Sequence, residues 1–166
     1  MDSFQRLLQE KHYPVDKEVL RQRIDELRQK LKLEHFEKQL NNSQHQPLTI
    51  YDLDSATGYE FENFLNILFK KMGYKVENTK LSGDQGADLV VEKFGEKIVV
   101  QAKRYNNKVT NRGVQEVVAA IKHYKADKGM VITTNEFTRS AIKLASSNNI
   151  KLIDRGELSK LISTYL

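Results

Sequence analysis

An acid, an amide and an amine lie at the ends of two short apolar segments near the middle of the chain. Asp88 begins the first segment, and Gln101 and Lys103 end the second. Because residues two apart on a strand point to the same side, Gln101 and Lys103 would share a face. If the segments form a hairpin, a two-residue turn at Phe94-Gly95 places Asp88 opposite Gln101. A turn at Gly95-Glu96 places it opposite Lys103 instead, still on that face. Either register predicts a site for a metal ion and water at the end of a sheet.

These residue types suit magnesium chemistry. Mg²⁺ prefers hard oxygen ligands and usually binds one or two carboxylates, with water and phosphate completing its shell. Asp88 offers a carboxylate, Gln101 an amide oxygen and Ala102 its backbone carbonyl. Lys103 has no acceptor when protonated, but it can hold an attacking water or stabilise charge on a phosphoryl oxygen. Asp88 also has an ordinary structural explanation as a cap of the preceding turn, and Lys103 as the start of a loop.

Composition excludes several classes of protein. The 166 residues carry a net charge of +5, from 27 basic and 22 acidic side chains, which permits a polyanionic partner such as DNA. Cysteine is absent, so thiolate catalysis, the usual structural zinc sites and disulfides are excluded. The sequence contains no phosphate-binding loop and no dinucleotide fingerprint. The first residues do not resemble a signal peptide, and no apolar run is long enough to span a bilayer. We expect a cytoplasmic protein with no membrane association.

The chain divides into two regions of unequal character. Residues 1–46 are rich in charged and amide side chains, and Leu20, Ile24, Leu27 and Leu31 form a helical stripe. This predicts a helical extension that ends in a linker, followed by a compact domain over residues 47–166. The extension is either an amphipathic helix packed on the body or a short coiled coil, which would make the protein a possible homodimer.

Helical and strand patterns alternate in the second region. The sequence predicts a helix that ends near Gly73, a strand, the hairpin, and then a helix-strand-helix-strand-helix series from about Val114, with Asn135 and Asp154 as helix N-caps. Such an order predicts an α/β fold with a mixed central sheet flanked by helices, extended at the N-terminus by the helical segment.

An ordered set of motifs resembles a known family. It comprises Phe61-Glu62, Gly73-Tyr74, Ser82 to Asp88, Gln101 to Tyr105, Val114-Gln115-Glu116, Phe137-Thr138 and Asn149 to Asp154. The set spans about 58–162 and is similar to the Mrr-type branch of the PD-(D/E)xK nuclease superfamily. The resemblance implies a restriction-endonuclease-like fold.

The resemblance also implies roles for the residues named above. Asp88 takes the place of the metal-binding aspartate and Lys103 that of the catalytic lysine. Glu62 matches the acid of the first helix and would be a further catalytic and metal ligand, with Glu60 as its rival. Gln101 stands where the wider superfamily usually has Glu or Asp, although the Mrr-type branch commonly has Gln there, and the site would have less negative charge as a result.

Basic and amide side chains near the proposed site predict contacts with DNA. Such residues would neutralise phosphates and fix the register of the protein on the duplex without reading sequence. The candidates are Gln85, Arg104, Tyr105, Lys108, Arg112 and Gln115.

These expectations favour an Mg²⁺-dependent DNA endonuclease, with Mn²⁺ as a possible substitute, acting in restriction of foreign DNA. One alternative is a non-cleaving DNA-binding module of the same fold. Another is a structure-selective Holliday-junction resolvase, which would require a dimer.

Overall fold

The computed structural model describes residues 18–21, 23–24, 27, 31, 49–79 and 86–166. The chain forms two compact units, Met1–Gln44 and His45–Leu166. The described residues of the first unit are helical, in agreement with the predicted helix. The predicted linker and Gln85 lie outside the described residues, and the domain boundary at residue 46 stays a prediction. Within the described parts, no helix is long and apolar enough to cross a membrane.

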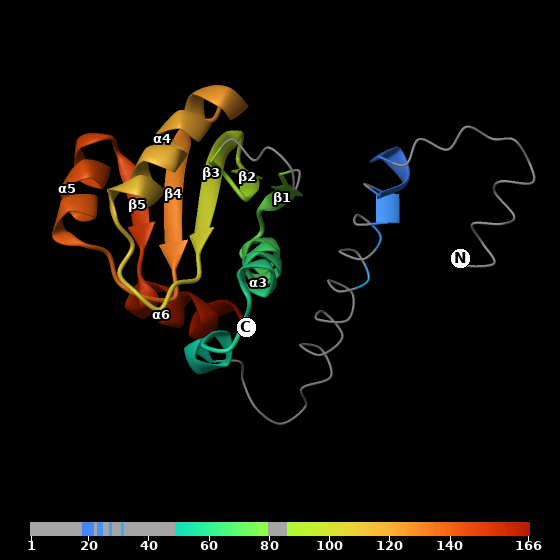
Figure 1. Cartoon of the computed structure of the whole chain (residues 1–166), viewed down its shortest axis with the longest axis horizontal. Coiled ribbons are helices and arrows are strands. Elements are labelled where there is room, and N and C mark those ends of the chain that lie inside the picture. Colours follow the sequence, from blue (N-terminus) through green and yellow to red (C-terminus); the bar gives the residue numbers. More distant parts are fainter. Residues whose placement is uncertain (1–17, 22, 25–26, 28–30, 32–48, 80–85) are drawn as a thin grey trace, which may run out of the picture. The chain divides into compact units, whose positions relative to one another are not determined.

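The second unit is built on a five-stranded mixed sheet in the order β1-β2-β3-β4-β5 (Figure 1). Strands β1 (Lys75–Asn78), β2 (Leu89–Lys93) and β3 (Glu96–Lys103) are antiparallel to their neighbours in this series. Strands β4 (Lys128–Thr133) and β5 (Ile150–Ile153) follow and run parallel to β3. The helices are η1 (Ile50–Leu53), α3 (Gly58–Lys71), α4 (Asn111–Tyr124), α5 (Arg139–Ser147) and α6 (Arg155–Tyr165). The predicted mixed sheet with flanking helices is confirmed.

Two crossovers decide which helices cover which face of the sheet. The connections β3-α4-β4 and β4-α5-β5 advance in the same direction, and right-handed crossovers then put α4 and α5 on one face. α3 and α6 contact each other and pack on the strands from the other side. Side chains alternate along each strand, so Val99 and Val131 belong to the core under α4 and α5. The site residues Gln101 and Lys103 continue the line of Val99 on this face.

The hairpin turn selects one of the two registers left open by the sequence. Lys93 pairs with Glu96, and Phe94 and Gly95 form the turn with φ angles of 54° and 82°. Positive φ at both central residues is what a type I′ turn requires. The last ladder pair, Leu89 with Val100, is followed in this register by Asp88 and Gln101.

Helix caps follow the sequence pattern with one exception. The Thr57 hydroxyl accepts a hydrogen bond from the amide of Glu60, and the Glu60 carboxylate accepts one from the amide of Thr57 at 2.7 Å. Asp154 caps α6 as predicted. The prediction for Asn135 was wrong, because α5 begins at Arg139 with Thr138 as its N-cap. Asn135 instead connects the segments that follow β3 and β4, donating from its side chain to the carbonyl of Tyr105 at 3.3 Å.

Candidate active site

The carboxylate of Asp88 joins the end of β2 to the end of β3. Its Oδ2 atom accepts hydrogen bonds from the side-chain amide of Gln101 and from the backbone amide of Ala102, the latter at 2.7 Å. The backbone amide of Asp88 donates to the carbonyl of Val100 at 2.9 Å. The carboxylate therefore takes over as acceptor where the regular ladder stops. This brings Asp88 and Gln101 together, as the Phe94-Gly95 turn predicts.

Lys103 lies two residues beyond Gln101 and forms an ion pair with α4. Its Nζ atom is 2.7 Å from Oε2 of Glu116, and the two side chains are 14% and 28% exposed. Arg112, one turn earlier on α4, approaches the other oxygen of Glu116 at 3.1 Å. Thr133 holds the backbone at this point, since its hydroxyl donates to the carbonyl of Lys103 at 2.7 Å. Lys103 is thus fixed from a helix and from the neighbouring strand.

Glu116 belongs to the Val114-Gln115-Glu116 motif, but no role in the site was predicted for it. It stands three residues after Gly113 and four before Ala120, both buried, so it shares the face of α4 that is turned to the sheet. Its neighbour Gln115, which was chosen, is exposed. The sequence did contain a signal for Glu116, because its spacing from Gly113 and Ala120 places all three residues on one face of the helix.

The environment of Glu116 favours its charged form. Burial by itself raises the pKa of this carboxyl, but the hydrogen bond and positive charge of Lys103, with a smaller contribution from Arg112, lower the pKa below its ordinary value. The acid therefore stays ionised at neutral pH and keeps its partner in place.

Gly86 lets the chain before Asp88 pass close to α4. It has a φ of +79°, and a Cβ atom there would lie 2.3 Å from the backbone oxygen of Glu116. Only glycine tolerates both the backbone conformation and the close approach. The segment that leads into Asp88 therefore contacts the same turn of α4 that carries the partner of Lys103.

The two acids near the start of α3 have different tasks. Glu60 is part of the capping box. Glu62 is half-buried and lies one turn before Asn66 on the same helix face. Asn66 donates to the side chain of Asn78 at 2.6 Å, and Asn78 pairs with Leu89, the residue after Asp88. Glu62 therefore belongs to the helix face that approaches the Asp88 end of β2, which favours it over Glu60 as the helical acid of the site.

The donor set fits a magnesium ion that keeps several waters. It offers the Asp88 carboxylate, the amide oxygen of Gln101, the backbone carbonyl of Ala102 and the carboxylate of Glu62 on the adjacent helix, all hard oxygen ligands. Among the described residues, no group of three or more His, Cys, Asp or Glu side chains could hold a metal ion. Neutral oxygen donors and solvent would therefore supply much of the coordination.

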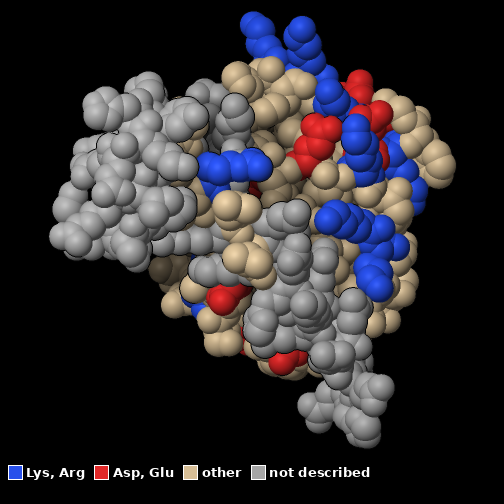
Figure 2. All heavy atoms as spheres, turned by 90° about the vertical axis from the view of Figure 1, so that its right-hand side faces the viewer, with Lys and Arg blue, Asp and Glu red and all other residues tan. Residues whose placement is uncertain are grey.

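The predicted DNA-contacting residues differ in how far their side chains are engaged. Lys108 is paired with Glu136 at 2.6 Å, and Arg112 with Glu116. Arg104 donates to the backbone carbonyl of Asp54, and Tyr105 is half exposed beside Lys103. Figure 2 shows that Lys and Arg side chains gather along one side of the visible face, with acidic side chains among them.

An acid, an amide and a lysine at the end of a mixed sheet flanked by helices are features of a restriction-endonuclease-like domain. The family model described as Restriction endonuclease (Mrr_cat) matches residues 53–162. The chain belongs to this family, and the resemblance seen in its sequence is confirmed.

Two known proteins show how far the similarity extends. The chain is 34% identical over 111 residues to the type IV methyl-directed restriction enzyme EcoKMrr of Escherichia coli (strain K12), an alignment that covers 61% of this chain and 36% of that enzyme. The chain thus spans about a third of the length of this relative. The structure of the DNA modification-dependent restriction endonuclease AspBHI is similar with a TM-score of 0.55 and 19% identity, over 70% of this chain and 35% of that one. This second likeness supports the fold.

Proposed function

We propose that residues 47–166 form a metal-dependent DNA endonuclease domain that hydrolyses phosphodiester bonds in restriction of foreign DNA. The observation that carries the proposal is the convergence of Asp88, Gln101 and Lys103 at one end of β3. Membership of the restriction endonuclease family supports the reaction class. The similarity to a methyl-directed enzyme supports the restriction role.

Asp88, Gln101, Ala102 and Glu62 would hold Mg²⁺, or Mn²⁺ in its place. When bound, the ion lowers the pKa of a coordinated water and polarises the scissile phosphate. Asp88 supplies the carboxylate at the strand end, and Gln101 and Ala102 add neutral oxygens, with Glu62 completing the set from α3. The amide hydrogen bonds that Asp88 accepts hold its carboxylate in a defined orientation.

Lys103 positions the attacking water and stabilises charge on the phosphoryl oxygens. A lysine ammonium has three hydrogens, so one can point to Glu116 while the others serve water and phosphate. Glu116 is a positioning residue in this proposal, because it acts on the reaction only through Lys103.

The surrounding basic and amide residues would place the duplex. Arg104, Lys108 and Arg112 neutralise phosphates, and Tyr105 offers an aromatic surface beside Lys103. Gln85 and Gln115 would contact the DNA backbone or the edge of the site. Restriction takes place where cellular DNA is, which agrees with a cytoplasmic protein.

A panel of DNA substrates tests the proposal. Supercoiled, linear, methylated and four-way-junction DNA are incubated with the wild type and with Lys103→Ala, each with Mg²⁺ and with EDTA. We expect cleavage by the wild type that requires the metal and is lost in the variant. Binding of DNA without cleavage of any substrate would contradict the proposal. Cleavage confined to junctions would assign the protein as a resolvase, for which a homodimer would then be required.

The second candidate function is a DNA-binding module that does not cut. The neutral Gln101, buried at 5% exposure where a carboxylate would add charge, favours it. It predicts that the protein binds DNA equally well with Mg²⁺ and with EDTA and cuts none of the substrates.

A further inference from the structure

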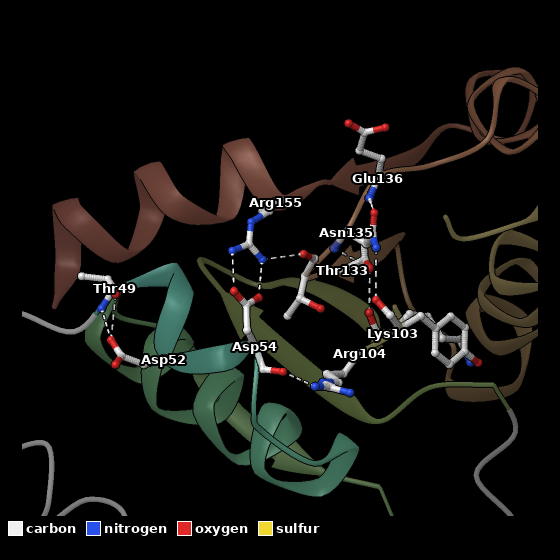
Figure 3. Close-up of polar contacts among 11 residues, drawn as sticks. Thr49, Asp52, Asp54, Lys103, Arg104, Thr133, Asn135, Glu136 and Arg155 are labelled. Carbon is white, nitrogen blue, oxygen red and sulfur yellow. Dashed lines mark hydrogen bonds and ion pairs between the residues drawn. The ribbon is translucent and has the colours of Figure 1, made fainter. Parts of the chain in front are cut away.

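A polar cavity of about 360 Å³ lies beyond the ends of β3 and β4. Its lining residues are Arg104, Tyr105 and Asn106 after β3, Thr134 and Asn135 after β4, and Asp54 and Arg155. Figure 3 shows Asp54, Arg104, Asn135 and Arg155 in one region, although they come from four parts of the chain that are far apart in sequence. The cavity therefore depends on the folded arrangement of η1, the sheet and α6.

The two arginines of the cavity are held in different ways. Arg155 forms a two-pronged ion pair with Asp54, with nitrogen-oxygen distances of 2.6 and 2.9 Å, and also donates to the carbonyl of Thr134 at 3.0 Å. Arg104 donates only to the backbone carbonyl of Asp54 in the described contacts. A carbonyl carries no net charge, so the charge of Arg104 is not neutralised by that bond. With one acid against two guanidinium groups, the lining has a net positive charge.

Hydrogen bonds connect the segments that form the base of the cavity. The hydroxyl of Thr133 donates to the carbonyl of Lys103 and accepts from the amide of Asn135 at 3.1 Å. The side chain of Asn135 in turn donates to the carbonyl of Tyr105. These bonds tie the segment after β3 to the segment after β4, as Figure 3 shows. These bonds restrain the backbone that carries Arg104 and Asn135. Less conformational entropy is therefore lost when a ligand binds to them.

Arg104 and Lys103 are neighbours whose side chains leave the sheet on opposite sides. Lys103 contacts Glu116 on α4, whereas Arg104 contacts Asp54, which follows η1 on the side of α6. Their Cα atoms are about 3.8 Å apart, since they are consecutive residues. A DNA strand that crosses the end of the sheet would therefore meet Lys103 with one phosphate and Arg104 with the next.

We propose that this cavity is a second phosphate site, which binds the backbone phosphate next to the one at Lys103. Arg104 supplies the charge and a planar fork of donors, and its hydrogen bond to the carbonyl of Asp54 connects it to the residue that pairs with Arg155. The inference rests on the proposed function for the identity of the ligand as DNA. The chemistry that it recognises, a phosphate oxyanion, is shared by free phosphate.

Titration with inorganic phosphate tests the cavity without any requirement for cleavage. Two-dimensional NMR spectra of the full chain should show saturable shifts at Asn106, Asn135 and the Nε signal of Arg104. Arg104→Gln should weaken phosphate binding by about tenfold or more, because charge-assisted hydrogen bonds are lost. Arg104→Lys, which keeps the charge, should retain part of the affinity and guards against a loss caused by misfolding.

Lys128→Ala is the matched control, since it removes one exposed positive charge at the opposite end of the sheet, outside the cavity. It should change phosphate affinity by less than about twofold, as expected for an exposed charge in water. Absence of saturable shifts in the wild type, or equal losses in Arg104→Gln and Lys128→Ala, would overturn the proposal.

Binding of a 20-base-pair duplex in EDTA then distinguishes a DNA site from a site for free phosphate. The slope of log affinity against log salt should fall by about one for Arg104→Gln, the amount expected for one lost phosphate contact. An unchanged slope together with phosphate binding would overturn the assignment to the DNA backbone. A wild type that shows both effects but cuts no DNA would contradict the endonuclease proposal and leave the phosphate site supported.

Discussion

Two lysine–glutamate ion pairs lie at opposite ends of the sheet and differ in their surroundings. Lys103 and Glu116, at the end of β3, are 14% and 28% exposed. Lys128 and Glu96, where β4 and β3 begin, are 60% and 43% exposed at nearly the same separation, 2.6 Å. Exposed pairs contribute little to stability, whereas buried charges cost free energy unless they are well paired. A protein that keeps the enclosed pair does so at some cost, which agrees with a role of Lys103 in function.

Other side chains at the two ends of the sheet also differ in how far they are buried. At the Lys103 end, a buried amide and a carboxylate bind one another. At the other end lies the hairpin tip, where Phe94 is 97% exposed. Polar groups are thus enclosed at one end of the sheet and an aromatic side chain is exposed at the other, the reverse of what burial preferences favour. The enclosed polar end is therefore the better candidate for chemistry.

The largest difference between the two pairs should be in catalysis. Lys103→Ala should reduce the rate of DNA cleavage by about 100- to 1000-fold, the loss typical of one preorganised donor to transition-state charge. Lys128→Ala removes the same side chain from the exposed pair and should leave the rate within about twofold. Single-turnover cleavage of supercoiled DNA measures both. Similar rates for the two variants would remove the basis for distinguishing the two ends.

Stability should show the next largest difference. Glu116→Gln leaves an enclosed lysine without its ionic partner and should lower the free energy of unfolding by roughly 1–3 kcal/mol, whereas Glu96→Gln should cost about 0.5 kcal/mol or less. Urea denaturation at pH 7 measures both values. Equal costs would show that enclosure does not matter to the pair.

The pH dependence of the same two variants carries a definite sign. The pKa of Glu116 is lowered in the folded protein, so its stabilising contribution is present above its unfolded value of about 4.3 and is lost as pH falls through the lowered folded pKa. The difference between wild type and Glu116→Gln should therefore shrink below about pH 4. A difference that grows on acidification would contradict this assignment of charge.

A smaller effect is expected at Gln101. Gln101→Glu places a second carboxylate beside Asp88, so the metal-free protein should lose stability through like-charge repulsion, by about 1 kcal/mol. Added Mg²⁺ should recover that loss, because the extra carboxylate is also a ligand. Thermal unfolding with and without Mg²⁺ measures the difference. Gln101→Ala is the control: it removes the amide without adding charge and should show no larger metal response than wild type.

The sequence predicted the elements well because their signals are local. Short apolar segments marked the strands, and Asp154 was correctly identified as a cap. The pairing of Asp88 with Gln101 was one of two registers, and the choice depended on whether Phe94 would adopt a positive φ, which few side chains do. Local propensity alone therefore could not decide the turn.

The roles and contacts that were missed depend on packing between distant segments. Glu116 becomes important because α4 lies against β3, and Gly86 because the chain touches α4 at that turn. Asp54 and Arg155 are 101 residues apart. Asn135 was misassigned as a cap because an Asn between strand and helix usually caps, whereas here it bonds Tyr105 across the sheet end. None of these relations has a signature within a short window of sequence.

The central claim is that Asp88 binds the metal with which this domain cuts DNA. The most direct measurement is the single-turnover rate of DNA cleavage as Mg²⁺ is increased, for the wild type and for Asp88→Asn. Asparagine keeps the shape of the side chain and an acceptor for the amide of Ala102 but removes the charge. We predict a rate that rises to saturation with Mg²⁺ in the wild type and stays at background in the variant. Cleavage in EDTA, or an Asp88→Asn protein that cuts with the same metal dependence, would contradict the claim.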